Sequence, residues 1–222
     1  MAPALALSRR VRGSVGMVKI GSQLFTAEGP RAVQRLAGLG LGVFLDLKFH
    51  DIPNTVGGSV AAAAALPGVQ MMTLHATGGL AMMQAAREAV AGRKTRPALL
   101  GVTILTSLDS AALRRVGLAG PASARVLALA RLAKAAGLDG VVASAHEAQA
   151  IRRACGPRFL IVVPGIRPVA ASAGDQARVA TPAEAIRAGA NYLVVGRPIT
   201  GADDPVAAAG KIAAEIAGAR RK

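Results

Sequence analysis

The chain has few or none of several sequence features on which particular classes of protein depend. It contains one cysteine, Cys155, so no disulfide can form within it, and a reducing cytoplasm is the expected compartment. It has one tyrosine and no tryptophan, which leaves few rings on which nucleic-acid bases could stack. No apolar stretch reaches about 18 residues, so we expect no membrane-spanning helix. Residues 1–16 lack the apolar segment of a secretory signal peptide.

Acidic residues are also few. The chain has 12 Asp and Glu against 27 Lys and Arg, which gives a formal net charge of +15. Such an excess suits either nucleic-acid binding through a basic patch or a site for an anionic small molecule. The basic residues are scattered in short groups such as Arg114–Arg115 and Arg220–Arg221. We therefore favour a small anionic ligand, with neither nucleic acid nor membrane as a partner, and keep a basic nucleic-acid-binding protein as the alternative.

Three histidines, His50, His75 and His146, are the only imidazoles, and they are too dispersed for the spacing of a metal site. We expect no metal, and we expect a structural role for His75 at the end of a strand. Cys155 stands at the end of a predicted helix and is not expected to be a nucleophile. No thiamine or pyridoxal motif is evident, so the chain is expected to work without a cofactor.

Short apolar runs alternate with helical segments throughout. The expected strands are 15–20, 43–49, 70–75, 98–105, 140–144, 159–163 and 192–195, and the expected helices are 2–12, 29–37, 53–66, 80–91, 121–136, 146–154, 181–188 and 205–217. This alternation predicts a parallel sheet covered by helices, for which the closed form is a (β/α)8 TIM barrel. No linker divides residues 1–222, so we expect a single barrel domain. Because the chain starts on a helix and has seven expected strands, the barrel is expected to be N-terminally truncated by one strand.

The most informative stretch is 43–56, where an apolar strand carries charged side chains. Asp46 and Lys48 lie two positions apart, so they point to the same face of the strand. If the apolar residues pack outward under helices, these charges point into the barrel, where they are costly unless paired. Asp51 follows just past the strand end. The alternative interpretation is a surface salt bridge at a strand terminus.

Further candidate residues fall at the carboxyl ends of predicted strands, which share one face of a barrel. The candidates are Lys19, Asp46, Lys48, Thr106, Arg167 and Arg197. Near the last two, Gly165 and Gly196 allow close approach of the backbone, and the arginines supply forked donors. Loops after the last two strands commonly bind phosphate in barrels. The glycines and arginines after the last two predicted strands therefore predict a phosphate site.

Several motifs together resemble the orotidine 5′-phosphate decarboxylase family. They are Asp-x-Lys-x-x-Asp at 46–51, His-Asp-Ile-Pro-Asn-Thr at 50–55, Pro-Gly-Ile-Arg at 164–167 and Val-Gly-Arg-Pro-Ile-Thr at 195–200. The first also suits related sugar-phosphate decarboxylases and synthases, whereas the longer strings are more specific. The resemblance runs in order along nearly the whole chain.

The resemblance implies cofactor-independent decarboxylation of orotidine 5′-phosphate to UMP in de novo pyrimidine synthesis. Lys48 would protonate pyrimidine C6, Asp46 would lie near the departing carboxylate, and Lys19 would join the charged array and contact the ribose. Thr106 would contact the pyrimidine. Apart from the resemblance, the polar loop 168–180 is expected to form a lid. The residues that would hold the 5′-phosphate are Arg167, Gln176, Gly196 and Arg197.

The resemblance also implies a homodimer, because Asp51, Ile52 and Thr55 would act in the partner subunit's site. One feature of the family is missing: its pattern opens with a strand ending in Leu-Asp, but no Asp precedes Asp46 here. We expect weakened folding and substrate binding as a result, and we favour a start assigned too late. The alternatives are an inactive truncated copy and a metal-dependent sugar-phosphate decarboxylase of the same suprafamily. That enzyme would need a further acidic ligand, for which Glu28 is poorly placed.

Overall fold

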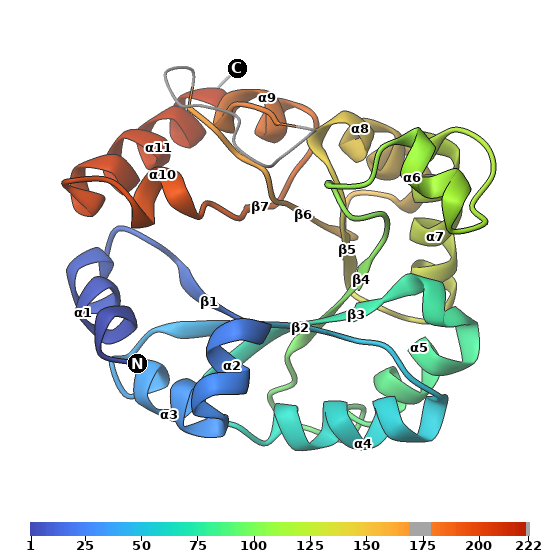
Figure 1. The fold of residues 1–222 in the computed structure, drawn as a ribbon, viewed down its shortest axis with the longest axis horizontal. Helices are drawn as coiled ribbons and strands as arrows, with labels where there is room; N and C mark the ends of the chain where they lie inside the picture. The colour runs from blue at the N-terminus through green and yellow to red at the C-terminus, as the bar shows by residue number, and fades with distance from the viewer. Residues whose placement is uncertain (169–178, 221–222) are drawn as a thin grey trace.

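The computed structural model describes residues 1–168 and 179–220, and their strands form one curled parallel sheet (Figure 1). Neighbours in the sheet follow the order of the chain, and every pair is parallel. The strands are β1 (Met17–Gly21), β2 (Gly42–Phe49), β3 (Val69–His75), β4 (Ala98–Val102), β5 (Gly140–Val142), β6 (Leu160–Val163) and β7 (Tyr192–Leu193). All seven predicted strands are therefore confirmed.

Helices lie on the outside of this sheet (Figure 1). They are α1 (Ala2–Val11), α2 (Ser22–Glu28), α3 (Pro30–Ala37), α4 (Pro53–Ala64), the 3-10 turn η1 (Ala76–Gly78), α5 (Gly79–Glu88), α6 (Ser110–Arg115), α7 (Ala122–Ala135), α8 (Ala145–Cys155), α9 (Pro182–Arg187), α10 (Arg197–Thr200) and α11 (Pro205–Arg220). The eight predicted helices are present. The sequence interpretation missed α2, α6 and α10, which are too short to show a helical period of apolar residues. Within the described ranges, no helix is both long and apolar enough to cross a membrane.

The sheet has a seam between β1 and β7. In the described part of the chain these two strands do not pair, so each is an edge. The helical layer continues across the seam, because Val11 of α1 packs against Ala209 and Ile212 of α11, and Figure 1 shows α1 beside α10 and α11. A groove of about 870 Å³ lies there, with Met17 and Tyr192 among its lining residues. The α/β class and the curled parallel sheet of the prediction are confirmed, and the observed form is an incomplete barrel among the described residues.

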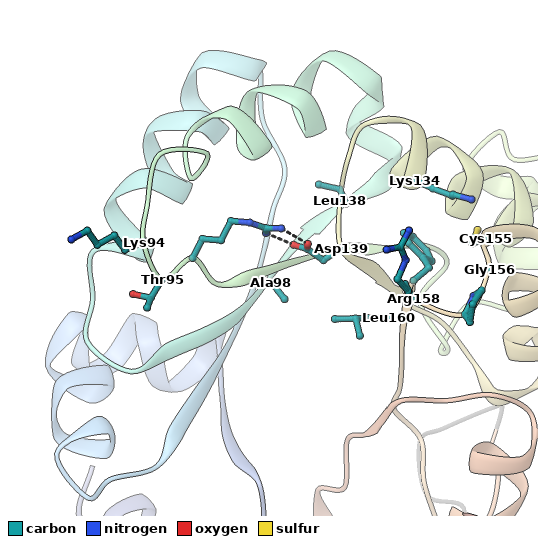
Figure 2. A pocket seen from close by; sticks show the side chains of 13 residues that line it. Lys94, Thr95, Ala98, Lys134, Leu138, Asp139, Cys155, Gly156, Arg158 and Leu160 are labelled. Atoms are coloured by element: carbon teal, nitrogen blue, oxygen red, sulfur yellow. Dashed lines mark hydrogen bonds and ion pairs between the residues drawn. The ribbon is translucent and has the colours of Figure 1, made fainter.

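A second hollow, of about 970 Å³, lies at the amino ends of β4–β6 (Figure 2). Arg96 donates hydrogen bonds to both carboxylate oxygens of Asp139, each at 2.7 Å. Lys94 and Lys134 point away from this pair and in different directions. Cys155 also lines the hollow, and burial raises the pKa of its thiol. The polar groups of this hollow therefore do not converge on one point, unlike those at the carboxyl ends of the strands.

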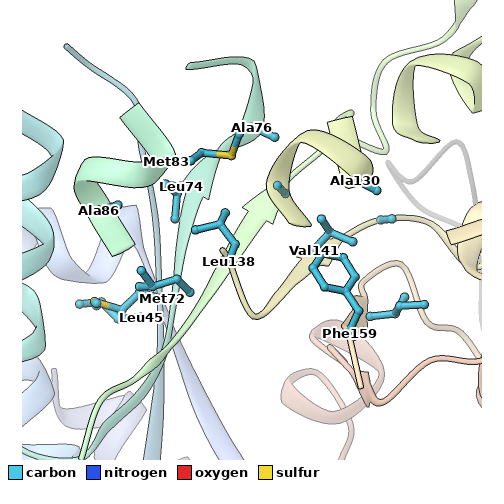
Figure 3. Close-up of a cluster of buried hydrophobic side chains, with 14 of the residues drawn as sticks. Leu45, Met72, Leu74, Ala76, Met83, Ala86, Ala130, Leu138, Val141 and Phe159 are labelled. Carbon is cyan, nitrogen blue, oxygen red and sulfur yellow. The ribbon is translucent and has the colours of Figure 1, made fainter. Parts of the chain in front are cut away.

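The main core fills the space between the sheet and the helices (Figure 3). Leu45 of β2 and Met72 and Leu74 of β3 meet Met83 and Ala86 of α5 in this layer. Side chains at alternate strand positions point to the other face. They form a small inner cluster of Phe44, Met71, Leu100 and Val162. The outward packing of Val43, Leu45 and Leu47 of β2 is therefore confirmed, and it directs the alternate charged residues toward the interior.

Candidate active site

Three charged side chains meet at the carboxyl ends of β1 and β2. Lys48 donates a hydrogen bond from Nζ to Asp46 Oδ1 at 2.9 Å. Lys19 Nζ lies 3.3 Å from the other carboxylate oxygen, Oδ2. The Asp46 side chain is only 12% exposed, whereas each lysine is 36% exposed. One largely buried carboxylate thus lies between two ammonium groups, which is more than a surface salt bridge.

The surroundings of Asp46 act on its pKa in opposite directions. Burial raises the pKa of this carboxyl, but the hydrogen bond from Lys48, the positive charges of Lys19 and Lys48, and the hydrogen bond from Thr73 outweigh burial. The net effect is a pKa below the usual 3.8. Asp46 is therefore an anion at neutral pH, and it gives the two lysines a fixed negative partner.

The charged array lies in a cleft of about 560 Å³ at the carboxyl ends of the strands. This is the end at which barrel enzymes place their active sites. Seven of the predicted site residues line the cleft: Lys19, Asp46, Lys48, Thr106, Arg167, Gly196 and Arg197. They come from β1, β2 and the segments after β4, β6 and β7, so the fold gathers residues that are far apart in the chain.

The opposite side of the cleft carries the two arginines. Arg167 is only 9% exposed and donates a hydrogen bond from Nη1 to the carbonyl oxygen of Ile166 at 2.9 Å. Gly165 has a φ of 73°, a conformation that side-chain-bearing residues rarely adopt. A Cβ built on Gly196 would meet no heavy atom within 4 Å. This side therefore combines open backbone with guanidinium groups, a combination that suits an oxyanion.

Other predicted residues lie elsewhere. Asp51, Ile52 and Thr55 are exposed and do not line the cleft, and Ile52 is 66% exposed. Asp51 Oδ1 accepts a hydrogen bond from the backbone N–H of Ile52 at 2.6 Å. Gln176 and most of the predicted lid lie outside the described residues. This subunit's cleft is therefore built without Asp51, Ile52 and Thr55.

Thr73, in the middle of β3, is a site residue that the sequence interpretation missed. It is fully buried and donates a hydrogen bond from Oγ1 to Asp46 Oδ1 at 2.9 Å. The one signal in the sequence is its polarity, since Thr73 interrupts the apolar run Met71–Leu74. Its partner is 27 residues away, and only the pairing of β2 with β3 brings the two together.

Two histidine rings lie close together beside the array, tilted by 38° to one another. The ring centroids of His50 and His75 lie 5.3 Å apart. Burial lowers the pKa of His75, and the neighbouring His50 and Lys48 lower it further, while Asp46 opposes this effect. His75 is therefore neutral at pH 7. No group of three or more His, Cys, Asp or Glu side chains that could hold a metal was found in the described ranges.

Comparison with known proteins gives a consistent result. A family model described as "Orotidine 5'-phosphate decarboxylase / HUMPS family" matches residues 1–212. Proteins named orotidine 5'-phosphate decarboxylase from Alkalilimnicola ehrlichii and Anaeromyxobacter sp. (strain K) are 55% and 57% identical. Each match spans 97% of this chain, and 91% and 93% of the respective relative.

A solved structure agrees with these matches. The crystal structure of orotidine 5'-phosphate decarboxylase from Lactobacillus acidophilus superposes with a TM-score of 0.80 at 39% identity. The match covers 94% of this chain and 92% of that one. With the cleft, the charged array and these matches in agreement, the chain belongs to the orotidine 5′-phosphate decarboxylase / HUMPS family.

Proposed function

We propose that the chain is a cytoplasmic enzyme that decarboxylates orotidine 5′-phosphate to UMP in de novo pyrimidine synthesis. The observation that carries the proposal is the Lys19–Asp46–Lys48 array in the cleft of a member of this family. Relatives of 55–57% identity that bear the name of this activity cover nearly the whole chain. They favour this activity over a metal-dependent sugar-phosphate decarboxylase or an inactive copy.

The reaction explains why fixed charges are needed. When the bond between C6 and the carboxylate breaks, CO₂ leaves and the electron pair stays on C6. No carbonyl is placed to delocalise this carbanion, so preorganised charge must stabilise it. We assign that role to the Lys48 ammonium, which then donates its proton to C6 and recovers one from water. These steps need no cofactor.

The other residues hold the substrate against this array. Anionic Asp46 would lie beside the substrate carboxylate, where repulsion favours the departure of CO₂. Lys19 would contact the ribose and Thr106 the pyrimidine. Binding of the distant phosphate offsets the cost of placing two carboxylates together. The residues assigned to the phosphate are Arg167, Gln176, Gly196 and Arg197.

The direct test follows loss of the orotate absorbance when purified chain is mixed with orotidine 5′-phosphate. We expect turnover to UMP, and we expect it to survive a strong chelator because no step uses a metal. The same assay on a chain extended upstream by an apolar strand shows how far such a strand improves turnover. No UMP from either chain would refute the proposal, and loss of activity with chelator would favour the metal-dependent decarboxylase.

We also propose that an eighth strand belongs between β1 and β7. The support is that both strands are edges among the described residues and that the seam groove lies between them. Unpaired edges are a liability in parallel sheets, which are normally covered or closed. An apolar strand ending in Leu-Asp, as in the family pattern, would pair with both edges and close the TIM barrel.

We further propose a homodimer in which Asp51, Ile52 and Thr55 serve the partner's cleft. The support is their exposure at the start of α4 and their absence from the lining of their own cleft. In a twofold dimer each site would then contain Lys48 from one subunit and Asp51 from the other. The two residues can therefore be removed from different subunits.

Mixing Lys48→Ala with Asp51→Ala subunits tests this arrangement. Each variant alone is expected to be nearly inactive. After equal mixing and exchange of subunits, half of the dimers contain one intact site out of two, so activity should return to about a quarter of the wild-type value. A mixture no more active than its separate components would contradict the shared site, and refolded single variants serve as controls.

A further inference from the structure

The pairing of β2 with β3 is interrupted beside the charged array. Leu45 pairs with Met72, and the next registered pair is Phe49 with Leu74. Residues 46–48 of β2 therefore lie opposite Thr73 alone. Bulges of this kind disrupt the ladder of hydrogen bonds and redirect side chains, and they are frequent next to active sites. This bulge contains both Asp46 and Lys48.

The bulge places Lys48 in an unfavourable backbone conformation. Its φ is 52°, and among the described residues no other non-glycine residue has a positive φ. In this region the Cβ comes too close to the following carbonyl oxygen, so an L-residue stays there only where its surroundings hold it. Because the ladder is interrupted, the backbone N–H of Lys48 also needs an acceptor other than a strand carbonyl.

Thr73 supplies that acceptor. Its Oγ1 accepts a hydrogen bond from the backbone N–H of Lys48 at 2.9 Å and donates its own proton to Asp46 Oδ1 at 2.9 Å. The same Oδ1 accepts a hydrogen bond from Lys48 Nζ. A hydroxyl can donate once and accept, so one side chain serves both contacts. The result is a closed ring from the Lys48 backbone through Thr73 and Asp46 to the Lys48 ammonium.

We infer that Thr73 is a positioning residue for the decarboxylation, which sets the place of the Lys48 ammonium by holding both its backbone and its carboxylate partner. Thr73 does not line the cleft and is fully buried, so it acts through Lys48 and Asp46 rather than on the substrate. The inference rests on the proposed function and deepens it. A displacement of about 1 Å in a reacting group can cost about 10²-fold in rate, which makes such a support measurable.

Thr73→Val replaces the hydroxyl by a methyl group and leaves the other branch of the side chain in place. We expect kcat to fall about 10- to 100-fold, because the N–H of Lys48 loses its acceptor and Asp46 loses a donor. We expect KM and the affinity for UMP to change less than about threefold, since the phosphate side of the cleft is untouched. Thr73→Ser keeps the hydroxyl and should return kcat to within about threefold of wild type.

Thr103→Val is the matched control. Thr103 is 2% exposed and donates a hydrogen bond from Oγ1 to the carbonyl oxygen of Val142 at 2.9 Å. The hydrogen bonds and ion pairs of the charged array involve Thr73 and not Thr103. It therefore loses a buried hydroxyl of the same kind without touching the array. We expect a fall in melting temperature comparable to that of Thr73→Val, with kcat nearly unchanged.

Three kinetic results would overturn the inference: wild-type kcat in Thr73→Val, no rescue by Thr73→Ser, or an equal loss of kcat in Thr103→Val. Crystal structures of the two Thr73 variants test it without turnover. In Thr73→Val we expect Lys48 to change φ or to lose its contact with Asp46, and in Thr73→Ser to keep both. Unchanged geometry in Thr73→Val would overturn the inference on its own. An inactive wild type would refute the proposed function instead, and the crystallographic comparison would still decide the role of Thr73.

Discussion

Lys48→Ala is expected to lower kcat for orotidine 5′-phosphate by about 10⁴-fold or more, the upper end for removal of a positioned proton donor. The variant loses both the cation beside the developing carbanion and the proton that ends the reaction, and the cleft contains no substitute at that place. Lys19 is bound to the other oxygen of Asp46, 3.3 Å away, so it cannot take over without breaking that contact. Single-turnover measurements with enzyme in excess will give the loss in the chemical step.

The fold should tolerate this change. The Lys48 side chain is 36% exposed, and Lys19 stays 3.3 Å from Asp46, so the buried carboxylate keeps a cationic partner in the variant. We therefore expect a melting temperature close to wild type and unaltered UMP binding. Lys211→Ala, at an exposed position of α11, is the control and should keep full activity. Turnover by Lys48→Ala within about tenfold of wild type would assign proton donation to another group.

Asp46→Asn is expected to lower kcat about 10²- to 10³-fold, comparable to the loss of one preorganised electrostatic group. Asparagine has nearly the same shape and can still accept hydrogen bonds from Lys48 and Thr73, so the change removes mainly the negative charge. The lysines then lose their fixed anion, and the substrate carboxylate loses the repulsion that favours its departure. UMP has no carboxylate at C6, so its affinity should fall much less than kcat.

The pH dependence of stability provides an independent measurement for the same variant. The pKa of Asp46 in the folded protein lies below its usual 3.8, so its contribution to stability is present above pH 3.8 and is lost as pH falls through the folded value. The wild type should therefore exceed Asp46→Asn in unfolding free energy at pH 7, and this difference should shrink in acid below pH 3.8. A difference between wild type and Asp46→Asn that is constant with pH would contradict the charge-based role.

Local sequence patterns were sufficient to predict most of the strands and helices. The alternation of apolar runs with helical segments was sufficient for the seven strands. The predicted helix 181–188 also carries a local start signal, since Thr181 and Glu184 form a capping box at the start of α9. Such signals depend on neighbours in the chain, so they can be recognised without tertiary contacts. The helices α2, α6 and α10 were missed because they have 7, 6 and 4 residues, too few for a periodic pattern.

The site divides in the same way. The amino-acid sequence by itself determined which side chains stand at strand ends, because apolar runs mark the strands. It also determined that these side chains lie on one face, because the carboxyl ends of parallel barrel strands share it. Only the tertiary structure decided that Lys19 and Lys48 share one carboxylate and that the sheet stays open between β1 and β7 among the described residues. It also decided that Thr73 supports Lys48. Strand register and bulges depend on the packing of residues distant in the chain, which no local pattern encodes.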